Sequence, residues 1–575
     1  MIELTSENII CCDCGWIRPK ESNLPKPGLV LLAIASACFA NVSLPALFSS
    51  DMVLQRNMPV PVWGSASPAE AVTVTFGGQA KTTTASSTGS WKVKLDPMPA
   101  SSSPRELRVA GTNSIALQNV VVGEVWLCSG QSNMELRLGW ESSNVYQDSI
   151  HDFPLIRQVD AKNSLPWNEC IKPYVEDFSV VAYFFGKDLF LSLGGQVPVG
   201  LILTAAGATS IERWTGSLNG DMYACCLAPY VGYGIRGVVW YQGESNTDNG
   251  AEYGGLLTGL IHEWRAAWAQ DSLAFLIVQL PNVDQLQTTP IETWGGNMEV
   301  REGQMLALAE PYTGLAITID MAGGNPADLH PLEKWVAGAR LVLWADHMVY
   351  GKKDFAYSGP IFRSMNVRGN KAYVRFYHAG AGLKAQSGSL DGFAVCGSDS
   401  QFVWATATPM GDSVVVFSSQ VSAPVAVRYS WANNPIGDLR NSAGLAASPF
   451  RSDGPRLPLG LFDEPPRDTT AAGKSCPRQQ YVGCQPLRLL QSAHRTACIV
   501  APAEATGIAV SDAAGRCVFR GRTDRKGLCI IPAGVFPPGV YAISAGNPGN
   551  TLLQRTIMVV LPRRYWISLT AASAH

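Results

Sequence analysis

The feature that most constrains the fold of this chain is a series of near-continuous apolar runs between residues 121 and 350. The runs read GEVWLCS, VPVGLILTAAG, IRGVVWYQGES, LAFLIVQLP and TGLAITID, and segments with helical spacing lie between them, such as SVVAYFFGKDLFLSLG and GGLLTGLIHEWRAAWAQ. Strands that are apolar on both faces are typical of parallel sheets covered on both sides. Because strands and helices alternate, the sequence predicts an α/β domain with a parallel sheet over residues 121–350.

The segments on either side of this block have the pattern of antiparallel β structure. Residues 41–120 contain alternating runs such as AVTVTF and WKVKL, which predict a β-sandwich, and residues 351–462 return to short strands. A Pro-rich, polar stretch opens a predicted linker over residues 463–500, followed by a β-rich domain over residues 501–575. At 575 residues the chain is too long for a single core, in line with several domains.

An apolar run near the N-terminus predicts export. Residues 29–40, LVLLAIASACFA, follow Lys20 and Lys26 and end in small residues that suit cleavage after Ala40. The run has the length of a signal-peptide core, whereas a membrane span takes about 20 residues. We therefore expect residues 1–40 to be a signal peptide with an N-terminal extension, and the protein to be periplasmic, secreted or on the cell surface. Lipidation at Cys38 and a buried helix in a cytosolic protein are the alternatives.

Composition narrows the class of ligand. The chain has 44 basic and 46 acidic residues and no basic tract, so nothing indicates a nucleic-acid partner or an acidic membrane surface. The low charged fraction of 16% is compatible with neutral, hydroxyl-rich ligands. No residue cluster has metal-ligand spacing, and we expect neither a metal nor an organic cofactor. Neither the oligomeric state nor any disulfide pairing among the 14 cysteines can be read from the sequence.

A serine stands where one apolar run ends. In VWLCSGQSNMEL, residues 125–136, Ser132 follows a predicted strand and opens a predicted helix. Ligands bind at the carboxyl ends of parallel strands, and a helix N-terminus stabilises negative charge there. Ser132 is therefore a candidate nucleophile, with a helix N-cap as the alternative. Met134 occupies the last glycine position of G-x-S-x-G, which disfavours the nucleophile elbow of an α/β-hydrolase.

A nucleophilic serine needs a base, and His330 is the best placed of the 7 histidines. It lies in IDMAGGNPADLHPLEKW, a Gly/Pro/Asn-rich loop between an apolar run and a helical pattern, at the edge where Ser132 is expected. Asp328, two residues earlier, could hold the imidazole tautomer and stabilise the imidazolium. The alternative for His330 is an ordinary loop or capping residue.

Two more loops at this edge could stabilise an oxyanion. Gly207 in LILTAAGATSIERW would let its N–H approach a substrate closely. Gln242 in VVWYQGESN brings a side-chain amide, with Glu244 and Asn246 close behind.

These motifs resemble, in order, those of the sialate O-acetylesterase family of SGNH-type (GDSL-like) hydrolases. The matching stretches are GEVWLCSGQSNM, GLILTAAGATSIERW, VVWYQGESN and DLHP, and LPALFSSDMVLQRNMPVPVWG resembles the opening of that family's β domain. The resemblance covers residues 44–460 and implies a flavodoxin-like α/β domain flanked by β-sandwich-like domains.

The resemblance also implies roles for the site residues. Ser132 would be the nucleophile, His330 the base and Asp328 the orienting acid, with the N–H groups of Ser132 and Gly207 as the oxyanion hole. Where the superfamily usually has a block with an Asn donor, this chain has WYQGESN. Where it usually has D-x-x-H, this chain has D-x-H. The third donor is therefore Gln242 or Asn246, and the acid is Asp328 or Glu244.

The implied activity is a carbohydrate O-acetylesterase that works through an acyl-enzyme on an acetylated sugar. Acetylated sialic acid and acetylated xylan or another plant polysaccharide are both open as substrates. A non-catalytic glycan-binding protein on an esterase scaffold is the competing class. VSDAAGRCVFRG and PPGVYAISAG in the last segment are similar to C-terminal secretion tails, with a carbohydrate-binding or spacer domain as the alternative.

Overall fold

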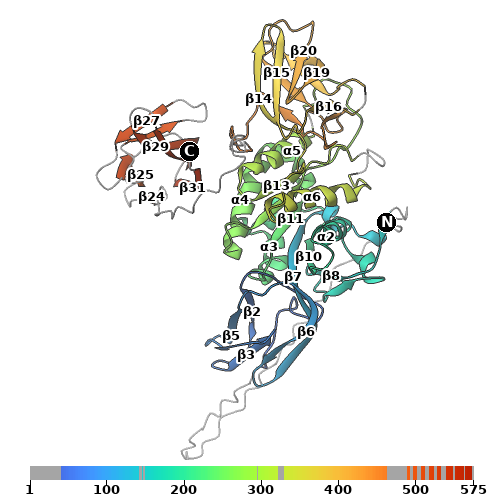
Figure 1. Ribbon diagram of the computed structural model, residues 1–575, viewed down its shortest axis with the longest axis vertical. Helices are drawn as coiled ribbons and strands as arrows, with labels where there is room; N and C mark the ends of the chain where they lie inside the picture. The colour runs from blue at the N-terminus through green and yellow to red at the C-terminus, as the bar shows by residue number, and fades with distance from the viewer. Residues whose placement is uncertain are drawn as a thin grey trace, which may run out of the picture. The chain divides into compact units, whose positions relative to one another are not determined.

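The computed structural model describes residues 41–140, 146, 149–293, 295–321, 329–386 and 388–462, together with the strands between residues 488 and 572. The chain forms two compact units, Met1–Asp463 and Glu464–His575, which are described separately (Figure 1). The predicted signal peptide and most of the predicted linker lie outside the described residues.

A parallel sheet forms the centre of the first unit. Its strand order is β13-β12-β11-β7-β10-β8-β9, in which all neighbours are parallel except the β8–β9 pair. Without β8 and β9 at one edge, the order is the 2-1-3-4-5 arrangement of flavodoxin-like proteins, which confirms the expected fold. The strands are β7 (Ser114–Gly130), β8 (Phe153–Asp160), β9 (Asn168–Cys170), β10 (Val199–Ala205), β11 (Gly237–Tyr241), β12 (Ala274–Val278) and β13 (Thr313–Ala316).

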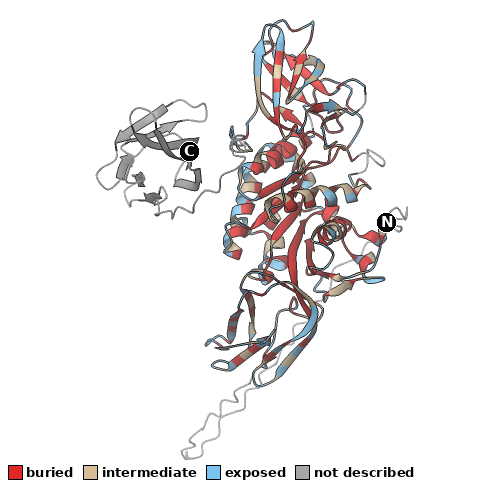
Figure 2. Cartoon of the chain, viewed as in Figure 1, coloured by how far each residue is buried: buried red, intermediate tan, exposed pale blue. Residues whose placement is uncertain are grey.

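Helices cover both faces of this sheet, as the continuous apolar runs require. In the register of the sheet Trp240 pairs with Ser129, three residues from Trp126, so the two tryptophans point to opposite faces. Trp126 contacts Phe185 of α2 (Val180–Ser192), and Trp240 contacts Trp264 of α4 (Gly250–Trp268). Helix α6 (Lys334–Met348) packs on α2, and α5 (Asn297–Leu306) packs on α4. Figure 2 shows the buried residues concentrated in this sheet and its helices.

Strand β7 belongs to two structures at once. Its first half pairs with β1 (Val53–Gln55) and β6 (Ser101–Ala110) of the N-terminal β structure, and its second half pairs with β10 and β11 (Figure 1). The predicted boundary at residue 120 therefore falls inside a single strand, and the two parts share one hydrophobic core. The other strands of the N-terminal part are β2 (Val60–Ser65), β3 (Ala71–Phe76), β4 (Gln79–Thr84) and β5 (Ser90–Leu95).

A β-rich part with a hydrophobic core of its own follows α6. It is joined to the part with the parallel sheet by Arg301 of α5, whose buried guanidinium donates to the carbonyls of Ala432 at 2.7 Å and Asn433 at 2.8 Å. Its strands are β14 (Ile361–Arg368), β15 (Lys371–Tyr377), β16 (Leu383–Ala385), β17 (Phe393–Cys396), β18 (Val403–Trp404), β19 (Thr406–Met410), β20 (Ser413–Phe417), β21 (Ala426–Tyr429), β22 (Leu439–Asn441) and β23 (Phe450–Arg451).

The second unit consists of strands in its described residues. Two of them, β24 and β25, lie within the predicted linker over residues 463–500, so the linker prediction is wrong at these positions. The sheets are β24-β25-β28 and β27-β26-β29-β30-β31. The bounds are β24 (Arg488–Gln491), β25 (Ala497–Val500), β26 (Gly507–Ser511), β27 (Cys517–Arg522), β28 (Leu528–Ile531), β29 (Gly539–Asn547), β30 (Thr551–Leu561) and β31 (Arg564–Ala572).

A helix that crosses a bilayer must be long and apolar. Within the described ranges of the chain, no helix has the length and hydropathy to cross a bilayer.

Candidate active site

The serine lies at a sharp turn directly after β7. Gly130 has a φ of 142°, and a Cβ at this position would lie 2.0 Å from the carbonyl oxygen of Tyr241, so only glycine fits. The next residue, Gln131, is the N-cap of α1 (Ser132–Glu135), and Ser132 is the first helical residue. The alternative role of Ser132 as an N-cap is therefore wrong, and its half-buried hydroxyl is available for other contacts.

His330 meets this serine from a loop 198 residues further along the chain. Its Nε2 lies 3.0 Å from Ser132 Oγ, within hydrogen-bond reach. The structure thus brings together the two groups that sequence reasoning selected as nucleophile and base. Asp328 lies outside the described residues, so its contact with His330 stays a prediction.

A buried asparagine next to the serine joins three loops. Asn133 Nδ2 donates to Glu244 Oε1 at 2.5 Å and to the carbonyl of Leu329 at 2.9 Å, and its Oδ1 accepts from Lys334 Nζ at 2.5 Å. Helix α1 is thereby tied to the loop after β11 and to the residue before His330. Sequence reasoning missed Asn133 and Lys334, although Asn133 lies inside the GQSNM stretch that signalled the site.

Glu244 is the alternative acid, and its surroundings are unusual. Burial raises the pKa of Glu244, while the hydrogen bond from Asn133 and the positive charges of Lys334 and His330 oppose the rise without cancelling it. Its second oxygen, Oε2, is buried and has no hydrogen-bond partner among the described residues. Glu244 therefore lies close enough to His330 to interact with it electrostatically.

Gly207, the predicted oxyanion-hole donor, lies beside Ser132. A Cβ on Gly207 would be 3.7 Å from the Cβ of Ser132. Its N–H, however, donates to Glu135 Oε2 at 2.6 Å, and Glu135 Oε1 accepts from Lys162 Nζ at 2.5 Å. Sequence reasoning considered neither Glu135, the last residue of α1, nor Lys162, which lies in the loop after β8.

The two amides expected as a third donor have structural contacts instead. Gln242 is fully buried, and its Nε2 lies 2.8 Å from Asn246 Oδ1 and 3.1 Å from both Gln131 Oε1 and the carbonyl of Thr209. These acceptors use both N–H bonds of the Gln242 amide. Asn246 is also buried, and its Nδ2 donates to Glu212 Oε2 at 3.0 Å. The expectation that either amide faces the substrate is therefore corrected, because both hold the loops together.

An exposed aromatic ring follows helix α1. Trp140 is 59% exposed, and the guanidinium of Arg137 lies 5.2 Å from its ring centroid. Arg137 is itself held by Asp160 at 2.6 Å and Asp177 at 2.7 Å. Such a supported, exposed ring is suited to stacking on a sugar.

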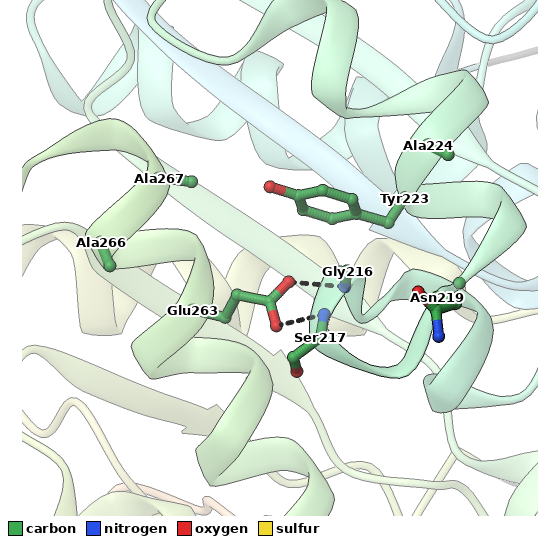
Figure 3. Close-up of a pocket in the computed structure, with 9 residues that line it drawn as sticks. Gly216, Ser217, Asn219, Tyr223, Ala224, Glu263, Ala266 and Ala267 are labelled. Carbon is green, nitrogen blue, oxygen red and sulfur yellow. Dashed lines mark hydrogen bonds between the residues drawn. The ribbon is translucent and has the colours of Figure 1, made fainter.

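An open hollow of about 620 Å³ lies elsewhere in the first unit (Figure 3). It lies between α4 and α3 (Asp221–Cys226), where Glu263 accepts hydrogen bonds from the N–H groups of Gly216 at 2.6 Å and Ser217 at 3.0 Å. None of the residues expected at the active site lines this hollow. Cys225 and Cys226 at the end of α3 form a disulfide, and Cys128, Cys170 and Cys396 are free and buried.

No metal site is evident in the part of the chain that the structure describes. Within it, no group of three or more His, Cys, Asp and Glu side chains could hold an ion.

Comparisons with known proteins show what this chain is similar to. The sequence profile of a family described as carbohydrate esterase, sialic acid-specific acetylesterase, matches residues 122–315. Human sialate O-acetylesterase is 26% identical over 509 residues, which cover 74% of this chain and 96% of that protein. The mouse sialate O-acetylesterase is 25% identical over 543 residues, which cover 74% of this chain and 97% of that protein. The crystal structure of a carbohydrate acetylesterase from Xanthomonas citri is similar with a TM-score of 0.67 at 36% identity, covering 72% of this chain and 99% of that one.

Proposed function

This chain belongs to the sialate O-acetylesterase family of carbohydrate esterases, and from that premise we propose that Ser132 is its nucleophile and His330 its general base. The protein is a carbohydrate O-acetylesterase, an enzyme that hydrolyses acetyl esters of sugar hydroxyls. The observation that carries the assignment of residues is the 3.0 Å separation of His330 Nε2 and Ser132 Oγ.

The reaction proceeds through an acetyl-enzyme. His330 Nε2 takes the proton of Ser132 while Oγ attacks the acetyl carbonyl carbon. The imidazolium then gives that proton to the ester oxygen of the sugar, whose bond to the acetyl carbon breaks, so that the sugar leaves with a free hydroxyl. Water, deprotonated by His330, attacks the acetyl-serine, and the imidazolium returns the proton to Ser132 Oγ as the bond to the acetyl group breaks and acetate leaves. The N–H groups of Ser132 and Gly207 stabilise the oxyanion in both steps, each contributing about 3 kcal/mol.

The imidazolium formed in each step needs a nearby negative charge. Asp328 is the first candidate, because it stands two residues before His330. Glu244 is the second, because it lies close enough to His330 for the positive charge of that residue to favour the charged form of Glu244. Either carboxylate would hold the imidazole with Nε2 toward Ser132.

We propose O-acetylated sialic acid as the first substrate to test. Two relatives are named sialate O-acetylesterases, whereas the name of the Xanthomonas citri protein specifies only a carbohydrate. Trp140 offers an exposed ring on which a sugar could stack. Acetate release from O-acetylated sialic acid, acetylated xylan and an N-acetylated sugar separates the candidates, and an ester-specific enzyme leaves the N-acetyl group in place.

Variants of the two reacting residues test the mechanism directly. Ser132→Ala is expected to abolish acetate release, and His330→Ala to lower kcat by roughly 10³-fold or more. The matched controls are Ser245→Ala and His262→Ala, which change an exposed serine and an exposed histidine and should keep the wild-type rate. Wild-type activity in Ser132→Ala, with the fold verified by circular dichroism, would rule out Ser132 as the nucleophile.

We also propose that the protein is exported. The support is the apolar run over residues 29–40 with Lys20 and Lys26 before it. N-terminal sequencing of the protein recovered from cell fractions tests this: a mature chain that begins near residue 41 outside the cytoplasm is expected. A full-length chain in the cytoplasm would contradict export.

A further inference from the structure

The oxyanion side of the nucleophile is already occupied by a carboxylate of the chain itself. Glu135, at the end of the helix that Ser132 begins, accepts the Gly207 N–H hydrogen bond at 2.6 Å through Oε2. Its other oxygen, Oε1, lies 2.5 Å from Lys162 Nζ. Gly207 follows β10, Lys162 follows β8 and α1 follows β7, so the segments after three neighbouring strands meet at this carboxylate.

This arrangement conflicts with acyl transfer unless Glu135 moves. A backbone N–H has one hydrogen, and the hydrogen of Gly207 is bound to Glu135. A developing oxyanion would need that same donor at 2.7–3.1 Å, and two negative oxygens cannot share it. Because a Cβ on Gly207 would lie 3.2 Å from Glu135 Oε2 and 3.7 Å from the Ser132 Cβ, the carboxylate and the serine border the same small space.

We propose that Glu135 is a plug of the oxyanion hole that the substrate displaces, and that Lys162 is the anchor that holds the displaced carboxylate. The proposal rests on the proposed function, since it takes Ser132 as the nucleophile and Gly207 as an oxyanion donor. The side chains of Glu135 and Lys162 are 18% and 26% exposed, which places the pair at the rim of the site. When the ester carbonyl enters, Glu135 loses the hydrogen bond from the Gly207 N–H but keeps its ion pair with Lys162. The negative charge of Glu135 therefore stays neutralised beside the forming oxyanion.

The test measures how fast a fluorophosphonate labels Ser132, because the phosphonyl oxygen needs the oxyanion hole whereas the probe carries no sugar. Glu135→Ala is expected to label about three- to tenfold faster and to lower KM for a small acetyl ester, since the Gly207 N–H is free. Lys162→Met is expected to label slower by a similar factor, because the carboxylate loses its anchor and stays on Gly207. The double variant is expected to behave like Glu135→Ala.

If Glu135 instead only stabilises the loop that carries Gly207, Glu135→Ala should be labelled more slowly than the wild type. Slower labelling of Glu135→Ala, or a Lys162→Met effect that persists in the double variant, would overturn the plug. If Glu135→Ala does not fold, Glu135→Gln answers the question, because it keeps an acceptor but loses the charge; faster labelling supports the plug and slower labelling overturns it.

Glu263→Ala is the matched control. The Glu263 carboxylate also accepts hydrogen bonds from backbone N–H groups, but it lies in the hollow of Figure 3. It should label at the wild-type rate, and the same acceleration there would overturn the proposal. Failure of the proposed function has a different signature: the wild-type protein is labelled at another residue, or Ser132→Ala is still labelled.

Discussion

At the scale of single residues, Glu244 shows how burial and charge compete beside the reacting groups. Burial raises the pKa of Glu244, and the contacts with Asn133, Lys334 and His330 reduce the rise without removing it. A raised folded-state pKa means that protonation of Glu244 stabilises the fold. This contribution is fully present below the unfolded-state pKa and is lost as the pH rises through the folded-state pKa.

Glu244→Gln should therefore raise the stability of the protein at higher pH and lower its activity. The variant does not titrate, so its free energy of unfolding should improve relative to the wild type as the pH rises through the pKa of Glu244. Its kcat should fall, because the imidazolium of His330 loses a nearby negative charge. Urea unfolding between pH 4 and 8 and acetate-release assays measure the two effects.

The control for this experiment is Glu252→Gln, which changes an exposed glutamate on α4. It should leave both the pH dependence of unfolding and kcat unchanged. A pH-independent stability difference for Glu244→Gln, or an unchanged kcat, would contradict the role given to Glu244.

Sequence reasoning could bring Ser132 and His330 together because each follows an apolar run, and the carboxyl ends of parallel strands share one edge. It could not find the partner of the Gly207 N–H, since this contact depends on the rotamer of Glu135 in a four-residue helix and on the path of a different loop. The error on Gln242 has a similar origin. An amide after a strand can face either the substrate or neighbouring loops, and only the positions of Gln131, Thr209 and Asn246 decide between them.

At the scale of elements, Asp320 connects the segment before His330 to helix α6 and to strand β22. Its carboxylate accepts hydrogen bonds from Arg340 of α6 at 2.5 and 2.8 Å and from Arg440 of β22 at 2.6 Å. Burial raises the pKa of Asp320, but the two arginines outweigh it and the pKa lies below its usual value. The resulting stabilisation is present above the unfolded-state pKa and is lost as the pH falls through the folded-state pKa.

Arg440→Ala is expected to lower the free energy of unfolding by about 1–2 kcal/mol at neutral pH, because a buried carboxylate loses one charged donor. The loss should shrink as the pH falls toward the pKa of Asp320. We also expect kcat to fall several-fold, since the segment that precedes His330 loses an anchor. Chemical unfolding and the ester assay measure these changes.

Arg375→Ala is the matched control, because Arg375 pairs with Asp412 on the exposed surface of the same β-rich part. Exposed pairs contribute little, so its unfolding and kcat should stay near the wild type. An Arg440→Ala variant with wild-type kcat would show that the β-rich part does not support the His330 loop.

The elements also show what the hydrophobic pattern can and cannot reveal. Along β7 the burial changes from alternating to continuous at about residue 120, and sequence reasoning interpreted the same change in pattern as a domain boundary. The change instead marks where one strand passes from a sheet with an exposed face into a sheet covered on both faces. Periodicity reports the surroundings of a strand, and it does not report where the strand ends.

At the scale of the whole molecule, the first unit combines three parts through buried contacts. The N-terminal part and the catalytic sheet share a core, and Glu124, 1% exposed, accepts from Arg56 at 2.5 Å and Arg236 at 2.8 Å where they join. Arg301 and Asp320 link the catalytic part to the β-rich part. The proposed catalytic groups that the structure describes all belong to this unit.

Removing the second unit tests whether the first is sufficient for catalysis. The described strands of the second unit pair among themselves, so ending the chain after Asp463 breaks no described sheet. The shortened protein is expected to keep kcat for a small acetyl ester within about twofold and to retain the midpoint of its main unfolding transition, as independent domains do. Ser132→Ala in the shortened chain is the control for background hydrolysis.

A large loss of kcat on the small ester would show that residues 464–575 are needed for catalysis itself. A loss confined to polymeric acetylated glycans would instead favour a carbohydrate-binding role for the second unit over a secretion tail.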